Sequence, residues 1–221
     1  DDLNSANPPS NPAVLEYLSE GFVSSGYDMK WLHREITTSE TYQRDWRPND
    51  TNGSDRRHFS RCIPRRLPAE VIYDALKQVT ASDEELLSLR DTLDRRAIGH
   101  LATQMAGTYA QRVFGQPERL IACDCERSNA PSLLQAIFLQ NDPLVHSRLA
   151  DSGWLKQIAL IQSPDSAQLV RDAYLRTVNR FPEANETQRA LQYISDSDST
   201  IDGMRDLLWS LINSREFILN H

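Results

Sequence analysis

Hydrophobic residues in this chain recur mainly every three or four positions, which is the repeat of an amphipathic helix. After Asn11-Pro12 this pattern predicts a helix that ends at Gly26. A second helix is predicted from Asp28, whose side chain suits an N-cap, toward Tyr42. The polar residues 45–57 follow, rich in Pro, Asn and Gly, and predict a loop.

The helical repeat continues through the rest of the chain. Ser82 and Glu85 have the spacing of a capping box, and Asn185 is expected to cap a later helix. The only short strand predicted is Leu120-Ile121-Ala122. Further helices are predicted over residues 68–79, from 82, over 133–138, from 143, and over 165–178, 185–194 and 201–212, and residues 154–161 are a short apolar segment.

These patterns predict a mainly α-helical fold. We expect a multi-helix domain with long irregular loops and at most one minor short-strand element. A chain of 221 residues suits one large domain, so we expect a single helical domain over residues 1–221. If this domain is subdivided, residues 1–128 would form a loop-rich helical half and residues 129–221 a helical bundle.

Composition narrows the class of protein. A hydrophobic content of 39% and a charged content of 25% are typical of a globular protein. No apolar run approaches the ~20 residues of a membrane span, so we expect none in this chain. The start Asp1-Asp2-Leu3 lacks the features of a signal peptide, and we expect a fragment whose targeting signal lies upstream. The net charge of -7 argues against a nucleic-acid partner.

Arginine supplies 21 of the 24 basic residues, and five arginines fall between residues 56 and 66. A guanidinium binds phosphate, sulfate or carboxylate through two parallel hydrogen bonds, so Arg65 and Arg66 are candidates for an anion site. Two alternatives to an anion site stay open. A GC-rich genome produces the same bias, and the arginines can pair internally with carboxylates such as those of Glu70 and Asp74.

A second candidate cluster places two thiols, two carboxylates and a guanidinium in five consecutive residues. Structural thiols are one interpretation, and a metal or redox role for Cys123 and Cys125 is the alternative, although zinc favours four ligands at wider spacing. Cys62 is the third cysteine, and pairing with either of the other two stays open. The residues of the cluster are Cys123, Asp124, Cys125, Glu126 and Arg127.

Aromatic side chains beside the polar loop are the third candidate. Tyr42 and Trp46 are expected to contact a ligand such as a sugar, whereas Trp31 and Trp209 fit helical patterns and are expected in the core. The chain lacks a Gly-rich phosphate loop, a Ser nucleophile elbow and a His-Glu-x-x-His motif. It also lacks Cys-x-x-Cys-His, so we expect no cofactor, and no c-type haem, in this chain.

Several separated blocks of the chain share one pattern. They are Asn7–Pro12, Tyr27–Lys30, Ser39–Gln43, Pro64–Glu70, Arg96–Ile98, Phe114–Arg119, Cys123–Ser128, Leu207–Phe217 and Asn220-His221. Together these blocks resemble one family, the planctomycete-specific C-terminal domain of unknown function found in large, cytochrome-like exported proteins. The resemblance covers nearly the whole chain. One position departs from it, because Gln116 stands where the family usually has Arg, which weakens any anion site that needs that cation.

The resemblance implies a periplasmic or cell-surface location and a preceding domain in the same protein, with haem, if present, in a separate N-terminal module. It implies no activity. We therefore expect a structural or interaction module that packs on the preceding domain or on other cell-envelope proteins. The alternative is a catalytic or substrate-binding part of an enzyme that acts on polysaccharide or another polymer, with Arg65, Arg66 and residues 123–127 near its site.

Overall fold

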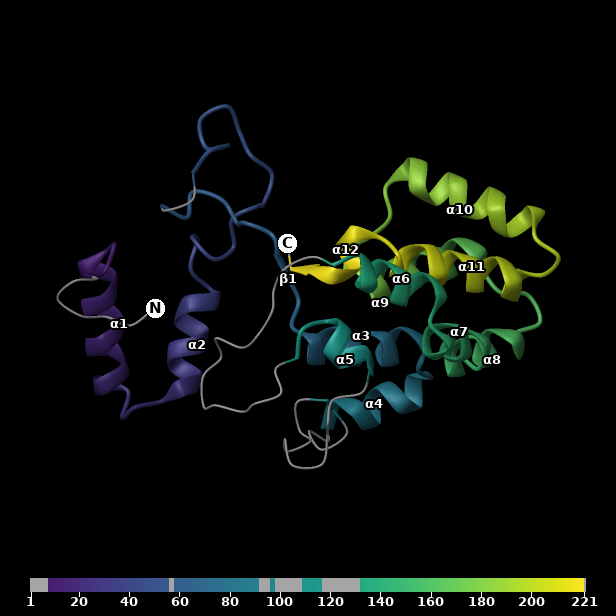
Figure 1. Ribbon diagram of the computed structural model, residues 1–221, viewed down its shortest axis with the longest axis horizontal. Coiled ribbons are helices and arrows are strands. Elements are labelled where there is room, and N and C mark those ends of the chain that lie inside the picture. The colour runs from purple at the N-terminus through teal and green to yellow at the C-terminus, as the bar shows by residue number, and fades with distance from the viewer. Residues whose placement is uncertain (1–7, 56–57, 92–95, 98–108, 117–131, 221) are drawn as a thin grey trace. The chain divides into compact units, whose positions relative to one another are not determined.

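The computed structural model describes residues 8–55, 58–91, 96–97, 109–116 and 132–220 (Figure 1). By its internal contacts the chain divides into two compact units, one ending at Arg65 and one running from Arg66 to Asn220. The expected boundary near residue 128 lies outside the described residues, so that subdivision stays a prediction. The mainly α fold is confirmed, with a minor two-stranded sheet.

Most of the helices follow the predicted order, whereas the two strands were not predicted. The first unit holds α1 (Pro12–Ser24) and α2 (Met29–Thr37). The sheet consists of β1 (Arg65–Arg66) and β2 (Leu219–Asn220). The second unit holds α3 (Ala69–Thr80), α4 (Asp83–Asp91), α5 (Tyr109–Val113), α6 (Leu133–Asn141), α7 (Pro143–Ala150), α8 (Gly153–Ala159), α9 (Ser166–Val178), α10 (Ala184–Asp196), α11 (Thr200–Ile212) and α12 (Arg215–Ile218).

In the first unit, α1 and α2 form a hairpin. The side chains of Asn11 and Asp28 accept hydrogen bonds from the first turns of α1 and α2, which confirms Asp28 as an N-cap. Gly21 lets the two helices approach, since a Cβ at this position would lie 2.1 Å from the indole of Trp31. The hydroxyl of Tyr17 on α1 donates to the carboxylate of Glu35 on α2 at 2.6 Å.

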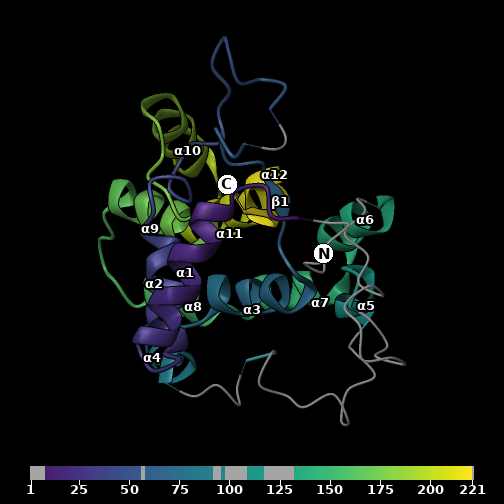
Figure 2. The same ribbon diagram turned by 90° about the vertical axis from the view of Figure 1, so that its left-hand side faces the viewer.

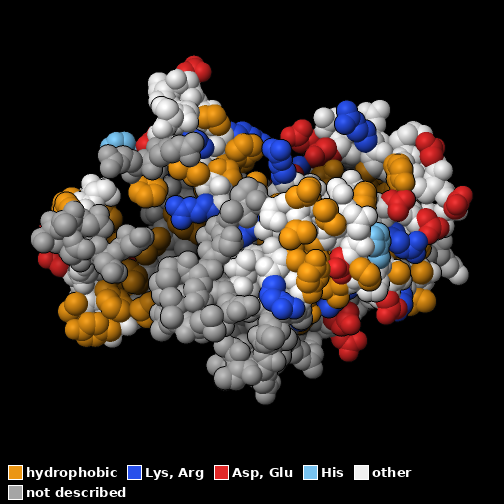
Figure 3. Space-filling view, viewed as in Figure 1, with side chains coloured by type: hydrophobic (Ala, Val, Ile, Leu, Met, Phe, Trp, Pro, Cys, Tyr) orange, Lys and Arg blue, Asp and Glu red, His pale blue; other side chains and the backbone are white. Residues whose placement is uncertain are grey.

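The first unit has no core of its own among residues 8–55 and 58–65, where no side chain is buried. Both helices expose apolar side chains, and Figure 3 shows hydrophobic groups at the surface of this unit on the left of the view. These exposed side chains include Val14, Tyr17 and Val23 on α1 and Met29 and Ile36 on α2. The hairpin therefore presents apolar surface that its own packing does not cover.

The second unit is built around α11. Its Met204, Leu208 and Ile212 are fully buried, as the helical repeat predicted. This helix packs against α7, α8, α9, α10 and α12, and α9, α10 and α11 lie together in Figure 2 as in Figure 1. On the other side of α9, α3 packs against α5, α7 and α8 and buries Ile72 and Val79. Two central helices thus share one hydrophobic core.

The sheet closes the second unit at the point where the chain enters and leaves it. The backbone N–H of Leu67 donates to the carbonyl of Ile218 at 2.9 Å. Neither strand shows the alternation of apolar and polar residues that identifies a strand in sequence, and neither was predicted. The strand that was predicted, at residues 120–122, lies outside the described residues.

The predictions for individual capping and core residues had different outcomes. The capping box of Ser82 and Glu85 is confirmed, with each side chain accepting the other's backbone N–H at 3.1 and 2.7 Å. The prediction that Asn185 caps α10 was wrong, because the helix starts one residue earlier and Glu183 forms a capping box with Glu186. The expectation that Trp209 lies in the core was also wrong. It occupies the exposed side of α11.

We predict that Gly203→Ala destabilises the second unit. The new Cβ would lie 2.9 Å from the backbone Cα of Ile194, so α10 and α11 must separate. Overpacking costs about 1–3 kcal/mol, which exceeds the gain of about 1 kcal/mol in helix propensity. The expected result is a lower free energy of unfolding in urea. Gly53→Ala is the control, because its Cβ would meet nothing closer than 4.0 Å. Equal stability of Gly203→Ala and the parent chain would contradict the close packing of these helices.

Candidate functional site

Only part of the predicted functional cluster falls within the described residues. Cys123, Asp124, Cys125, Glu126 and Arg127 lie outside them, so the roles predicted for these five residues stay predictions. Arg65 and Arg66 form β1, where Arg65 is exposed and Arg66 is half-buried.

Arg66 is held by the second unit. Its Nη2 donates to the carbonyl of Phe114 at 3.1 Å, directly after α5. The amide of Gln135 on α6 donates to the neighbouring carbonyl of Val113 at 3.1 Å, so two side chains satisfy the C-terminal carbonyls of α5. Burial lowers the pKa of the Arg66 guanidinium. This arginine contributes to the packing of the fold at the position where an anion site was predicted.

Tyr42 and Trp46 lie at the start of the polar loop, and both side chains are exposed. The guanidinium of Arg47 lies 5.7 Å from the centre of the Trp46 ring and 3.6 Å from the carboxylate of Asp45. The ligand contact predicted for Tyr42 and Trp46 stays a prediction. The structure adds Arg47, a cation beside the indole, to that pair.

Arg61 organises this loop. The loop closes where the backbone N–H of Cys62 donates to the carbonyl of Asp45 at 3.1 Å. The Arg61 guanidinium donates to the carbonyls of Trp46, Asn52 and Gly53, each at 3.3 Å. One side chain therefore joins both ends of the loop to its middle, because guanidinium donors point in several fixed directions.

Asp55 and Phe59 define the far side of the loop. The carboxylate of Asp55 accepts the backbone N–H groups of His58 and Ser60 at 2.9 and 3.0 Å, and also the Ser60 hydroxyl. Phe59 between them adopts a left-handed backbone with φ of 52°, yet its ring is exposed. A bulky residue in this region is an outlier that its surroundings must hold in place.

The remaining features concern the third cysteine, metal ions and membrane spans. Cys62 is a free, half-buried thiol. Within the described ranges, no group of three or more His, Cys, Asp or Glu side chains could hold a metal ion. No helix in the same ranges is long and apolar enough to cross a membrane.

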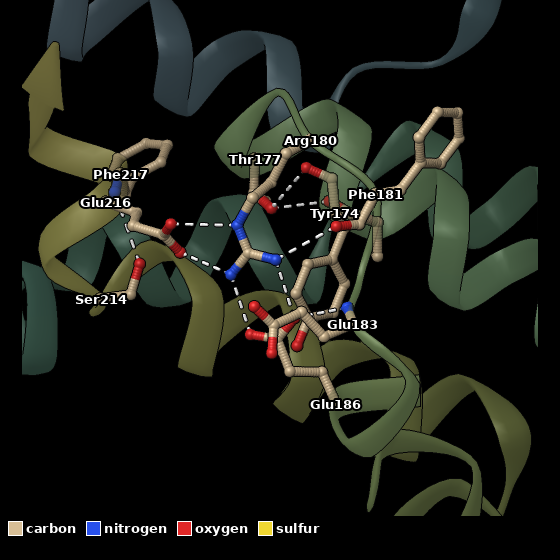
Figure 4. Close-up of polar contacts among 10 residues, drawn as sticks. Tyr174, Thr177, Arg180, Phe181, Glu183, Glu186, Ser214, Glu216 and Phe217 are labelled. Carbon is tan, nitrogen blue, oxygen red and sulfur yellow. Dashed lines mark hydrogen bonds and ion pairs between the residues drawn. The ribbon is translucent and has the colours of Figure 1, made fainter. Parts of the chain in front are cut away.

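The structure also contains a network of ion pairs around one half-buried arginine, which was not predicted. Arg180, just after α9, lies between two carboxylates (Figure 4). It donates to both oxygens of Glu186 on α10 at 2.7 and 2.8 Å and to both oxygens of Glu216 on α12 at 2.9 and 2.8 Å. Its guanidinium also lies 5.4 Å from the centre of the Tyr174 ring. One arginine thereby links three helices.

The electrostatics of this network follow from its geometry. Hydrogen bonds from Arg180 lower the pKa of the Glu186 carboxyl below its usual 4.5. The two carboxylates raise the pKa of Arg180 in turn. Burial raises the pKa of the Tyr174 hydroxyl. These shifts favour the charged forms of Arg180 and Glu186, as an ion pair between helices requires.

A second arginine has the same kind of role. Arg176 on α9 lies 4.4 Å from the centre of the Trp154 ring on α8. It also donates to the carbonyl of Ala81 at 3.1 Å and pairs with the carboxylate of Asp83 at the start of α4. A cation over an indole is the strongest form of cation–π contact. Arg176 thus joins α9 to α4 and α8.

Part of the Arg180 network, its pairing with Glu186, could have been predicted from the sequence. Glu183 and Glu186 have the i, i+3 spacing of a capping box, and Arg180 lies three residues before it. Glu216 is 36 residues away, and its approach depends on how α12 packs. Pairing of this kind needs the tertiary structure.

Comparison with known proteins identifies the family. Residues 1–194 match the family described as PSD1, a protein of unknown function (DUF1553). The chain belongs to this family. Neither a curated protein nor a solved structure matches the chain. The family assignment agrees with the domain of unknown function expected from the sequence blocks, and it names no activity.

The family match ends earlier in the chain than the second unit does. The matched residues stop at 194, inside α10, whereas α11, α12 and β2 follow and belong to the second unit. Because α11 carries three fully buried side chains of the core, the second unit of this chain extends beyond the matched residues to Asn220.

We predict that a chain truncated after residue 194 loses cooperative unfolding. Without α11 the apolar faces of α7 to α10 stay exposed, and their burial is the main stabilising term. The measurement is thermal unfolding by circular dichroism. The control is residues 64–221, which keep β1 and the whole second unit and are expected to unfold in one transition. A cooperative transition in the chain ending at residue 194 would show that α11 is dispensable.

We also predict that Arg180→Gln destabilises the second unit in a pH-dependent way. Charged hydrogen bonds of this kind contribute about 1–2 kcal/mol when solvent screens them partly. Since the folded pKa of Glu186 is lowered, its contribution is present above pH 4.5 and is lost as pH falls through the folded value. The difference between the parent chain and Arg180→Gln should therefore be largest at pH 7 and shrink as pH falls below 4.5.

Urea unfolding at several pH values measures this difference. Lys156→Gln is the control, because Lys156 and its partner Asp151 are both highly exposed. We expect this control to differ from the parent chain much less than Arg180→Gln does at every pH, because solvent screens the exposed pair. A gap between Arg180→Gln and the parent chain that stays constant from pH 7 to pH 3 would show that the carboxylates do not stabilise the fold through Arg180.

Proposed function

We propose that this chain is a non-catalytic helical module that packs on a neighbouring domain of the same, larger protein. In this proposal the protein is an exported, cytochrome-associated protein of the cell envelope in planctomycetes, as the resemblance of the sequence blocks implies. The module is structural. It helps to assemble a complex, and haem chemistry belongs to another module.

The observation that carries the proposal is the α1–α2 hairpin. Its helices have 13 and 9 residues, and helices shorter than about 12–15 residues are marginal in water without tertiary packing. No described side chain of residues 8–65 is buried, while apolar groups on both helices are exposed. Such a hairpin gains stability when another surface covers it, which is how an interaction module works.

The second unit supports the same proposal. Arg176 and Arg180 use their guanidinium groups to join helices, and their carboxylate partners are engaged in the same ties. The catalytic alternative depends on Arg65, Arg66 and residues 123–127. Five of these seven residues lie outside the described ranges, and Arg66 already donates to a backbone carbonyl.

Hydrogen exchange of the backbone amides tests the proposal. The experiment compares the full-length protein with the 221-residue chain alone. We expect amides in α1 and α2 to exchange at least about tenfold more slowly in the full-length protein, because the neighbouring domain covers them. Amides of α11 are the internal control and should be protected equally in both. Equal exchange of α1 and α2 in the two proteins would overturn the proposal.

A further inference from the structure

The charge of this acidic chain is unevenly distributed. Residues 42–66 contain seven arginines and three aspartates, a net charge of +4, whereas the whole chain carries -7. The remaining residues therefore carry -11. A local positive region of this kind attracts an anionic partner, while the acidic remainder repels it.

The basic region also holds exposed aromatic rings. Trp46 and Phe59 are 38% and 57% exposed, and Tyr42 is 57% exposed. Phe59 keeps its ring in solvent although its left-handed backbone is unfavourable for a bulky residue. An exposed ring on a strained backbone adds nothing to the hydrophobic core. Strain of this sort is concentrated at ligand-binding sites.

The backbone behind these rings is fixed before any ligand arrives. Nη1 of Arg61 holds the carbonyl of Trp46 at 3.3 Å, and Nη1 of Arg44 holds the carbonyl of Phe59 at 3.2 Å. The carboxylate of Asp55 accepts backbone N–H groups on either side of Phe59. Because these bonds are made in the free protein, binding costs less ordering of the chain.

We propose that Tyr42, Trp46, Arg47 and Phe59 form a binding surface for an acidic polysaccharide. The apolar face of a pyranose ring stacks on an aromatic ring, and its carboxylate or sulfate group binds a guanidinium. Arg47 lies 5.7 Å from the Trp46 ring and 3.6 Å from the exposed carboxylate of Asp45, so a sugar acid that reaches both groups takes the place of Asp45 at the guanidinium.

This surface is separate from the apolar residues on which the proposed function rests. The hairpin is expected to contact a protein domain, and the loop is expected to contact a polymer. The two proposals therefore fail independently. Loss of polysaccharide binding leaves the hydrogen-exchange result for α1 and α2 unchanged.

Binding is tested by isothermal titration calorimetry on the 221-residue chain with four polymers. Polygalacturonate and dextran sulfate carry sugar rings with carboxylate or sulfate groups, neutral dextran has sugar rings alone, and polyglutamate has carboxylates alone. We expect binding to one or both acidic polysaccharides that weakens with added salt. Which of the two binds more tightly identifies the anionic group. Equal affinity for polyglutamate, or binding to neutral dextran only, would overturn the proposal.

Matched variants locate the surface. Trp46→Ala and Arg47→Gln are each expected to weaken binding about tenfold, through loss of stacking or of the charged contact. Trp209→Ala is the control for Trp46→Ala, because Trp209 is similarly exposed at 36% on α11. Arg189→Gln, an exposed arginine of α10, is the control for Arg47→Gln. Unchanged affinity in both loop variants, or an equal loss in the controls, would place binding elsewhere and refute the assignment.

Discussion

The burial of α11 is the constraint on which the second unit depends. This helix contacts α7, α8, α9, α10 and α12, and its Met204, Leu208 and Ile212 have no exposed surface. Gly203 allows α10 to approach its first turn, and Ser214 begins α12 directly after it. Helices this short are unstable alone, so the helices that contact α11 depend on its apolar surface for their stability. This central helix lies beyond the residues that match the family, which stop at 194.

Arginine side chains join separate elements of the fold in this chain. Arg61, Arg66, Arg176 and Arg180 each donate to backbone carbonyls that follow a helix or line a loop, and two of them bind carboxylates as well. The planar guanidinium offers five donors, so it satisfies a carbonyl and a second group together, which a lysine ammonium does less well. The arginine bias has physical uses inside the fold, whatever the composition of the genome that encodes it.

Sequence reasoning predicted the parts of the fold that depend on local spacing. The apolar repeat identified α3, α9 and α11, and the Ser82–Glu85 spacing identified the start of α4. It placed Trp209 in the core because periodicity gives a helix face without saying which neighbours cover it. The approach of Arg180 to Glu216 and the pairing of β1 with β2 join distant residues, and no local pattern encodes them. At the candidate site, the sequence predicted a ligand contact for Tyr42 and Trp46 because they lie beside the polar loop, and that contact stays a prediction. The roles of Arg61 and Phe59 depend on loop geometry.

The pairing of β1 with β2 has a topological consequence. Because Leu67 bonds to Ile218, the two ends of the second unit lie side by side. Because its ends are adjacent, the packing of the helices does not require the chain of this unit to begin at residue 66 and end at residue 220. A circular permutant that joins residue 220 to residue 66 and opens between α8 and α9 retains every helix contact of the core. Such a unit can be inserted into another chain, because its two junctions with the host lie only one strand spacing apart.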